Sequence, residues 1–221
     1  MTEQAELAAA RARMVQQLAA RGIDSPAVLA AMGKVPRERF VPGEQRQRAY
    51  DDSPLPIGCG QTISQPWMVA RMVQELELTG RERVLEVGAG SGYGAAMLAE
   101  LAAEVHTVER HPELARRATT LLAELGCERV TVVVGDGSQG WPDGAPYDAM
   151  VVTAAGPRIP PALLEQLKVG GRLVLPVGED LDHQQLLRVE RLGPEEYRQQ
   201  VLAQVRFVPL VGEQGWTDPG T

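Results

Sequence analysis

The stretch that decides the fold is Val84-Leu85-Glu86-Val87-Gly88-Ala89-Gly90-Ser91-Gly92-Tyr93-Gly94. In it, an apolar strand leads into a turn with glycine at every second position, and a helix-forming run over residues 95–101 follows at once. Glycines at this spacing let the backbone bend sharply and come close to a ligand, because no Cβ stands in the way. The following helix directs its unpaired N–H groups and its positive end toward the turn. The stretch therefore predicts a cradle for a nucleotide-type cofactor.

Strands and helices alternate downstream of this cradle. We expect strands over residues 83–88, 104–109, 129–134, 147–153 and 171–177, and helices over residues 92–102, 112–125 and 160–168. Continuous apolar strands such as residues 149–152 are what a sheet covered on both faces requires. The alternation predicts an α/β fold with a doubly wound, mostly parallel, Rossmann-like sheet. Two further extended runs, 184–191 and 197–208, are close enough in sequence to pair as a hairpin.

Two helices are expected at the start of the chain. Residues 3–21 predict an amphipathic helix whose apolar side consists of Leu7, Met14, Val15 and Leu18. A second, short helix is expected to begin with Asp24 or Ser25 as its N-cap and Pro26 at its first position, and to end near Gly33. The sequence therefore predicts a helical extension that packs on the rest of the chain.

A long segment without a regular period follows this extension. Residues 35–42 are bracketed by prolines and are expected to be extended. Residues 50–66 have neither a helical nor a strand period, and stretches of this length inside a compact chain are usually functional or disordered. Their apolar and small polar residues are unlike the charged composition of disordered segments. We therefore expect an ordered functional loop there, followed by a helix from Pro66 to about Leu78.

The composition limits the class of function. The chain has 221 residues, and 44% of them are hydrophobic, so it can bury a sizeable core. Its net charge of −7 argues against a general nucleic-acid binder, because phosphate contacts need a basic face. No apolar run approaches the roughly 18 residues of a membrane span, and the first residues lack the apolar region of a signal peptide. Cys59 and Cys127 show neither metal-site nor disulfide spacing. We expect a cytoplasmic monomer without metal, nucleic-acid or membrane partners.

Three acidic residues indicate which cofactor the cradle takes. The residues from Gly90 to Ala95 fit the pattern G-x-G-x-x-A, which is compatible with a dinucleotide cofactor. Glu86, however, stands at the strand end where a pyrophosphate would pass, and its carboxylate suits a cationic ammonium and sulfonium instead. Glu109 follows the turn by about 20 residues, the distance at which a carboxylate accepts both ribose hydroxyls. Asp136, followed by Gly137, can accept the amino protons of adenine. Together these residues predict S-adenosyl-L-methionine and a class I methyltransferase fold.

The loop and the turn together resemble the protein-L-isoaspartate (D-aspartate) O-methyltransferase family. The resemblance spans about residues 7–212, and it is carried by residues 50–58 (YDDSPLPIG), 60–66 (GQTISQP), 84–93, 135–137, 147–149, 153–155, 170–178 and 207–210. The glycine turn and Asp136-Gly137 are common to many methyltransferases, whereas the 60–66 loop is specific to this family. Cys59 stands where the family commonly has another residue, and Trp67 occupies a position that varies within it. Both residues touch the predicted substrate side.

The resemblance implies methyl transfer from S-adenosyl-L-methionine to the free α-carboxylate of L-isoaspartyl residues in damaged proteins, with D-aspartyl residues as a further candidate substrate. The product cofactor is S-adenosyl-L-homocysteine, and the methyl ester then collapses to a succinimide without help from the enzyme. A carboxylate is ionised at neutral pH, so the reaction needs alignment rather than a strong base. We expect one methyltransferase domain over 1–221, with the helices and substrate loop in 1–80, the cofactor core in 81–178, and C-terminal strands and tail in 179–221.

The resemblance also assigns site residues. It marks Ser64 as the active-site residue, and we expect the Ser64 hydroxyl to orient the substrate carboxylate by one hydrogen bond. Ser64 is not expected to be a covalent nucleophile, because His106, His111 and His183 show no pattern of partners that would activate it. The expected cofactor-binding residues are Gln61, Thr62, Ser64, Glu86, Gly88, Gly90, Ser91, Gly92, Glu109, Arg110, Asp136 and Gly137. The expected substrate-binding residues are Asp52, Leu55, Pro56, Ile57, Gly58 and Val211.

Three other functions are weaker interpretations of the same residues. A methyltransferase acting on bases or nucleic acid often has Asp/Asn-Pro-Pro-Tyr after the fourth strand, where this chain has Thr153-Ala154-Ala155-Gly156. A relative that binds the cofactor without turnover would not need the intact 60–66 loop with Ser64. A nicotinamide oxidoreductase is disfavoured by Glu86.

Overall fold

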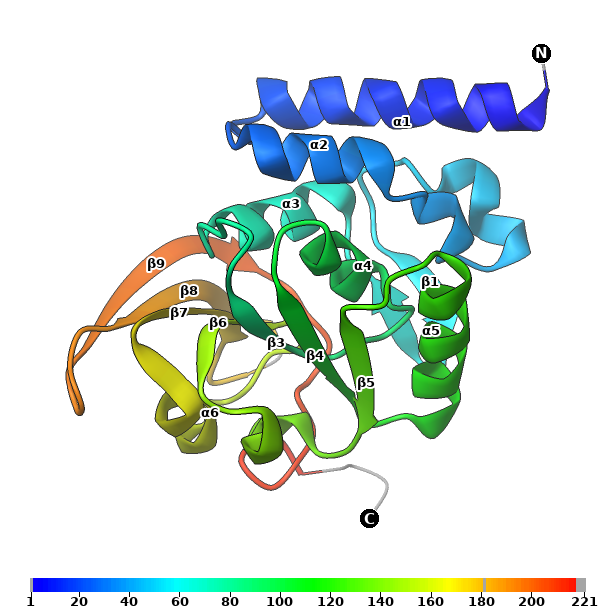
Figure 1. Cartoon of the computed structure of the whole chain (residues 1–221). Coiled ribbons are helices and arrows are strands. Elements are labelled where there is room, and N and C mark those ends of the chain that lie inside the picture. The colour runs from blue at the N-terminus through cyan, green and yellow to red at the C-terminus, as the bar shows by residue number, and fades with distance from the viewer. Residues whose placement is uncertain (1, 181, 218–221) are drawn as a thin grey trace.

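A computed structural model describes residues 2–180 and 182–217 of the chain. Within these residues the largest element is a seven-stranded sheet with the order β5-β4-β3-β6-β7-β8-β9 (Figure 1). Its strands are β3 (Arg83–Val87), β4 (Glu104–Glu109), β5 (Val130–Val134), β6 (Tyr147–Val152), β7 (Leu167–Val177), β8 (Gln184–Arg191) and β9 (Tyr197–Val205). Strands β3 to β7 pair in parallel, and β8 and β9 add an antiparallel hairpin. The predicted doubly wound, mostly parallel sheet is confirmed.

Helices cover both faces of the sheet. On one face, α3 (Pro66–Gln74), α4 (Tyr93–Ala99) and α5 (Pro112–Glu124) pack against apolar side chains such as Val84. On the other face, Leu85 belongs to a second core that includes residues of α6 (Pro161–Gln166), beside the short 3₁₀ turns η3 (Gly137–Gln139) and η4 (Pro142–Gly144). Neighbouring residues of one strand point to opposite faces. Burial on both sides therefore explains the continuous apolar strands.

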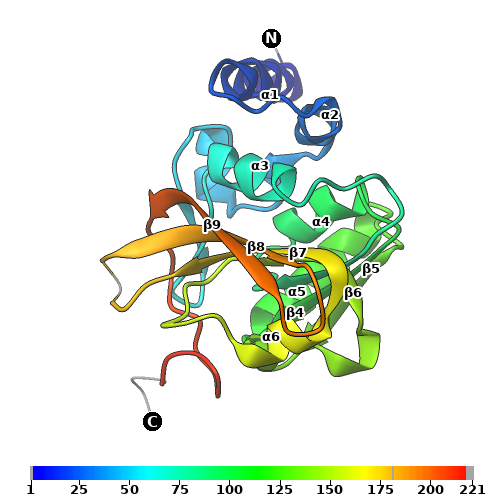
Figure 2. The ribbon, with the colours of Figure 1, turned by 90° about the vertical axis from the view of Figure 1, so that its left-hand side faces the viewer.

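The N-terminal extension forms a further helical layer (Figures 1 and 2). Helix α1 (Glu3–Ala20) buries Leu7, Met14 and Leu18, and Val15 packs beside them while staying partly exposed. Helix α2 (Pro26–Lys34) begins where the Ser25 hydroxyl accepts a hydrogen bond from the backbone N–H of Val28, so Ser25 is the N-cap. Both predicted helices are confirmed, and they lie above α3 and α4. No helix in the described part of the chain is long and apolar enough to cross a membrane.

Upstream of the sheet, one prediction is wrong and another is incomplete. Residues 35–42 are not extended, because they contain a 3₁₀ turn, η1 (Arg37–Arg39), which is followed by another, η2 (Gly43–Arg48). A proline restricts its own φ and the residue before it, so the residues between the two prolines are free to turn. The 50–66 loop is ordered, as expected, but it contains a hairpin of β1 (Leu55–Gly58) and β2 (Gln61–Ile63). Its chain reversal runs through Gly58, Cys59 and Gly60, whose φ angles are 97°, 53° and 68°.

Several element ends also differ from the prediction. Helix α3 ends at Gln74 rather than near Leu78, and Glu77 adopts a left-handed φ of 50° that no helix continues. Strand β7 begins at Leu167, four residues earlier than expected, directly after the end of α6. Strand β9 ends at Val205, three residues before the predicted end at 208. These shifts lie outside the carboxyl ends of β3 and β4, where the site is.

Candidate active site

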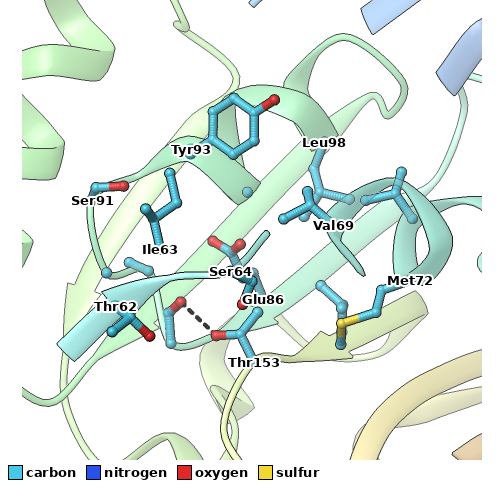
Figure 3. A pocket seen from close by; sticks show the side chains of 16 residues that line it. Thr62, Ile63, Ser64, Val69, Met72, Glu86, Ser91, Tyr93, Leu98 and Thr153 are labelled. Atoms are coloured by element: carbon cyan, nitrogen blue, oxygen red, sulfur yellow. Dashed lines mark hydrogen bonds between the residues drawn. The ribbon is translucent and has the colours of Figure 1, made fainter. Parts of the chain in front are cut away.

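Two adjoining cavities lie at the carboxyl ends of the parallel strands. Strand β3 pairs with both β4 and β6, so the chain reverses its direction of travel across the sheet at β3. Ligands of open α/β sheets bind in the crevice at this reversal. The first cavity lies over the glycine turn (Figure 3), and the second lies toward β4 and the chain after β9. Both are lined by Thr62, Gly88, Gly90 and Thr153, so they are two halves of one elongated site.

Most predicted cofactor residues line these two cavities. The first cavity is lined by Ser64, Glu86 and Ser91 in addition to the four shared residues. The second is lined by Gln61, Glu109, Arg110 and Gly137, and also by His111 and Val211. Gly92 instead faces α5, where a Cβ would press on Ala118 and Leu122. Val211 was expected on the substrate side, whereas the structure places it in the lining of the second cavity, with the residues predicted to bind the cofactor.

The glycine turn leaves no room for a side chain at Gly88 or Gly94. Gly88 has a φ of 95°, and a Cβ built on it would overlap the Thr153 hydroxyl. A Cβ on Gly94 would overlap a carboxylate oxygen of Glu86. The backbone N–H of Gly88 donates to the carbonyl of Val108 at 2.8 Å, which fixes the turn to the end of β4. The turn is thus a rigid backbone surface that a ligand can approach closely.

Glu86 is a buried acid at the end of the first cavity. It accepts a hydrogen bond of 2.6 Å from the Thr107 hydroxyl through one oxygen. Burial raises the pKa of Glu86 to about 8, and the hydrogen bond from Thr107 only partly offsets this effect. A cation placed beside the carboxylate would favour its ionised form. Glu86 is therefore suited to an ammonium group, as the sequence predicts.

Glu109 is held in place by two backbone groups at the end of β4. One carboxylate oxygen accepts from Gly90 N at 2.8 Å, and the other accepts from His111 N at 2.9 Å. Each carboxylate oxygen has a further acceptor site. The residue lines the second cavity, so it can accept the two hydroxyls of a ribose there.

Asp136 is occupied by contacts within the protein. Its Oδ1 accepts from the backbone N and the hydroxyl of Ser138 at 2.9 and 2.7 Å, and its Oδ2 accepts from the backbone N of Glu213 at 2.8 Å. Burial raises the pKa of Asp136, but the hydrogen bonds from Glu213 and Ser138 together hold it below its ordinary value. Asp136 does not belong to the lining of either cavity, whereas Gly137 does. Its contact with adenine stays a prediction.

The chain after β9 forms one wall of the second cavity. Val208 O accepts from Ala155 N at 2.8 Å, and Leu210 N donates to Ala155 O at 2.8 Å. The indole N–H of Trp216 donates to the same carbonyl of Ala155 at 2.9 Å. Residues 208–211 line the cavity as a result. Segments far apart in the sequence therefore enclose the cofactor half.

A third groove meets the first cavity at Thr62, Ser64 and Thr153. The Thr153 hydroxyl lies 2.9 Å from the carbonyl of Gly88 and 3.1 Å from that of Val87, so its proton is directed at the backbone (Figure 3). From this junction the groove runs outward between the start of α3 and the residues around Phe207. A substrate in this groove would reach the cofactor cavity at Ser64.

The predicted substrate residues upstream of Ser64 do not line this groove. Leu55 and Ile57 are buried in the core, and Pro56 and Gly58 are exposed on the other side of β1. Asp52 accepts a hydrogen bond of 2.9 Å from the backbone N of Trp67 and pairs with Arg21, so it organises the start of α3. A peptide could contact β1 only through its backbone, Pro56 and Gly58.

Arg37 is a site residue that the sequence did not reveal. It is fully buried, and it donates from Nε to the carbonyl of Ala49 and from Nη2 to that of Ser64, both at 2.7 Å. Its guanidinium lies 4.8 Å from the ring centroid of Tyr93, the first residue of α4. Arg37 thus ties both ends of the substrate loop to the glycine turn. In the sequence it stands in a charged run, RER, which gives no signal of burial.

The sequence profile of the protein-L-isoaspartate (D-aspartate) O-methyltransferase family matches residues 9–215 of the chain. The chain belongs to this family. Protein-L-isoaspartate O-methyltransferase 1 of Rhodopseudomonas palustris is 59% identical over 95% of this chain and 86% of its own length. A solved structure of a protein-L-isoaspartate O-methyltransferase is 29% identical, with a TM-score of 0.86, over 93% of this chain and 67% of its own. A Plasmodium falciparum structure described as a member in complex with S-adenosyl-L-homocysteine is 25% identical, with a TM-score of 0.75, over 89% and 95%.

Membership of the protein-L-isoaspartate O-methyltransferase family confirms the predicted reaction class. The chain is an S-adenosylmethionine-dependent protein carboxyl methyltransferase that acts on isoaspartyl residues. In residues 2–180 and 182–217, no group of three or more His, Cys, Asp or Glu side chains is placed to hold a metal ion. The finer question is which of its own residues hold the cofactor and the substrate.

Proposed function

We propose that methyl transfer to the L-isoaspartyl α-carboxylate takes place at the junction of Thr62, Ser64 and Thr153. The observation that carries this proposal is that these residues are shared by the cofactor cavity and the outer groove. The junction thus gives a bound peptide direct access to a bound cofactor. D-Aspartyl residues would enter the same groove as a second substrate.

The residues around the glycine turn fit S-adenosyl-L-methionine. A Cβ on Gly88 would overlap Thr153, which supports a turn adapted to close backbone approach, and the buried Glu86 offers a carboxylate to an ammonium group. Glu109 would hold the ribose, with Gln61, Arg110 and Gly137 beside it in the second half. When bound, the cofactor supplies an electrophilic methyl group at the junction.

Ser64 and Thr153 have different roles at the junction. The Thr153 proton is directed at a backbone carbonyl, so Thr153 presents only acceptor sites to the cavity. Ser64 has no hydrogen bond to its hydroxyl within the described residues, and its backbone is fixed by Arg37, so its hydroxyl can donate to a substrate carboxylate. An isoaspartyl carboxylate is already ionised, because its ordinary pKa is about 4. The protein therefore needs to orient this group rather than to remove a proton.

Apolar side chains limit the access of water to the junction. Ile63, Val69, Met72 and Leu98 line the first cavity around Ser64 (Figure 3). A carboxylate that loses its hydration shell beside this apolar wall, and keeps one hydrogen bond, is a better nucleophile than a fully hydrated carboxylate. The wall belongs to β2, α3 and α4, and Arg37 joins Ser64, which follows β2, to Tyr93 of α4.

We also propose that the chain acts as a single domain, as a monomer and in the cytoplasm. Residues 208–211, far from the cradle in sequence, complete its cavity, which supports one functional unit over the chain. Cys59 and Cys127 are both free thiols, which suits a reducing compartment. The net charge of −7 supports protein substrates over nucleic acid or membrane surfaces.

The test is a transfer assay with labelled S-adenosyl-L-methionine on two peptides that differ only in Asp against isoAsp. We expect label on the isoAsp peptide alone, and equal labelling of both would refute the proposal. In Ser64→Ala we expect kcat to fall by about a hundredfold, the size of the loss of one oriented hydrogen-bond donor. Binding of S-adenosyl-L-homocysteine should be retained in this variant. Loss of that binding would show that Ser64 serves the cofactor instead.

A further inference from the structure

The outer groove extends well beyond the reaction junction. Past Thr62, Ser64 and Thr153 its lining is mainly apolar, and beside Gln65, Gln204 and Arg206 it consists of Pro54, Trp67, Met68, Val205, Phe207 and Val208. Of the described residues that line it, Arg206 alone carries a formal charge, and that guanidinium is 79% exposed and pairs with Asp182. The groove therefore suits an uncharged, apolar group rather than an ionic one.

Trp67 is fixed in this groove before any ligand arrives. Its backbone N–H donates to Asp52 at 2.9 Å, and its indole N–H donates to the carbonyl of Arg21 at 3.3 Å. The Arg21 guanidinium lies 5.2 Å from the indole centroid and forms an ion pair with Asp52. An aromatic side chain that is already ordered costs little entropy when it is covered by a ligand. Trp67 is thus a preorganised apolar surface.

The groove is continuous with the place where the isoaspartyl residue reacts. A peptide whose carboxylate lies at Ser64 must leave the junction along the groove, since the cofactor cavity occupies the other side. In an extended peptide the neighbouring side chains follow at about 3.3 Å per residue. The residues nearest in sequence to the isoaspartyl residue are therefore the ones that meet Trp67.

We propose that Trp67, Met68 and Phe207 form a subsite for an aromatic or long aliphatic side chain, carried one or two residues from the isoaspartyl residue of the substrate. The proposal rests on the proposed function, because it assumes that the substrate carboxylate reaches Ser64. It makes position 67 a determinant of which damaged sites are repaired first.

The experiment compares isoAsp peptides that carry Gly, Leu or Phe at each position from two residues before to two residues after the isoAsp. For the wild type we expect KM to be about tenfold lower with Leu or Phe than with Gly at one or more of these positions. An open groove covers about half of such a side chain, and burial of that apolar area accounts for a change of about this size. In Trp67→Ala the ratio of the KM values should fall to about one. Trp67→Phe, which keeps an aromatic ring, should retain part of the preference.

Two controls separate the outcomes. Val201→Ala truncates an exposed apolar residue of β9 outside the groove, and it should keep the wild-type ratio. Calorimetry with S-adenosyl-L-homocysteine verifies that each variant still folds its cofactor half. Equal KM values for Gly, Leu and Phe at every position in the wild type would overturn the subsite, and so would an unchanged preference in Trp67→Ala. A wild type that binds S-adenosyl-L-homocysteine but labels no isoAsp peptide would refute the proposed function instead.

Discussion

The buried Glu86 makes cofactor binding dependent on pH. Burial raises the pKa of Glu86 to about 8, so most of the ligand-free protein carries the neutral acid at pH 7. A ligand with an ammonium group requires the ionised carboxylate, and binding must therefore release a proton. With this pKa, ionising Glu86 costs about 2.7 kcal/mol at pH 6 and about 1.4 kcal/mol at pH 7. We expect the affinity for S-adenosyl-L-homocysteine to rise about ninefold from pH 6 to pH 7.

Titration calorimetry in two buffers of different ionisation enthalpy measures this proton directly. Below pH 7 the amino group of the ligand stays protonated, because its ordinary pKa is about 7.7 to 8.0. We expect the wild type to release close to one proton and Glu86→Gln to release none, with weaker binding that no longer follows pH. Glu124→Gln removes an exposed carboxylate that pairs with Arg39 and should behave as the wild type. Binding without proton release in the wild type, or equal release in Glu86→Gln, would refute this reasoning.

Three further predictions concern single residues. The pKa of Glu86 is about 8 in the folded protein and 4.5 ordinarily, so the contribution of Glu86 to stability is lost as the pH rises between these values. Glu86→Gln should therefore raise the Tm of the ligand-free protein at pH 9. An unchanged Tm would contradict a buried carboxylate at this position. Arg37→Met removes two hydrogen bonds to backbone carbonyls, so it should lower the free energy of unfolding in urea titrations by about 3 kcal/mol and should also lower kcat. A wild-type free energy of unfolding together with a wild-type kcat would count against a role of Arg37 in holding the substrate loop. Asp136→Ala should weaken binding of S-adenosyl-L-homocysteine by about tenfold in calorimetry, and an unchanged Kd would remove Asp136 from the site.

The fold could be predicted because its signals are local in the sequence. The expected strand 104–109 coincides with β4, and the Ser25-Pro26 pair marks the start of α2. The hairpin within 50–66 was missed because Pro54, Pro56 and the glycines hide its alternation of buried and exposed residues. Only the packing of Leu55 and Ile57 against the core shows that these residues form a strand.

Site residues could be predicted where an acidic residue lies near the carboxyl end of an apolar strand. The positions of Glu86 and Glu109 beside the cavities could be predicted, because they lie near the carboxyl ends of the apolar strands β3 and β4; their contacts with the cofactor stay predictions. The sequence predicts a substrate contact for Asp52 and no role for Arg37, because the contacts that both residues make depend on partners distant in sequence. Asp52 meets Arg21 and Trp67, and Arg37 meets the carbonyl of Ser64. Such contacts arise from tertiary packing, which no short motif records.

The wall formed by residues 208–211 has a consequence for synthesis of the protein. These residues follow β9, so they leave the ribosome after every strand of the sheet has been made. The second core and the second cavity are therefore completed together and last, since Leu210 belongs to that core and lines that cavity. The hydrogen bonds from Ala155 N to Val208 O and from Leu210 N to Ala155 O join this late segment to the chain after β6. A nascent chain that lacks these residues would lack one wall of the second cavity.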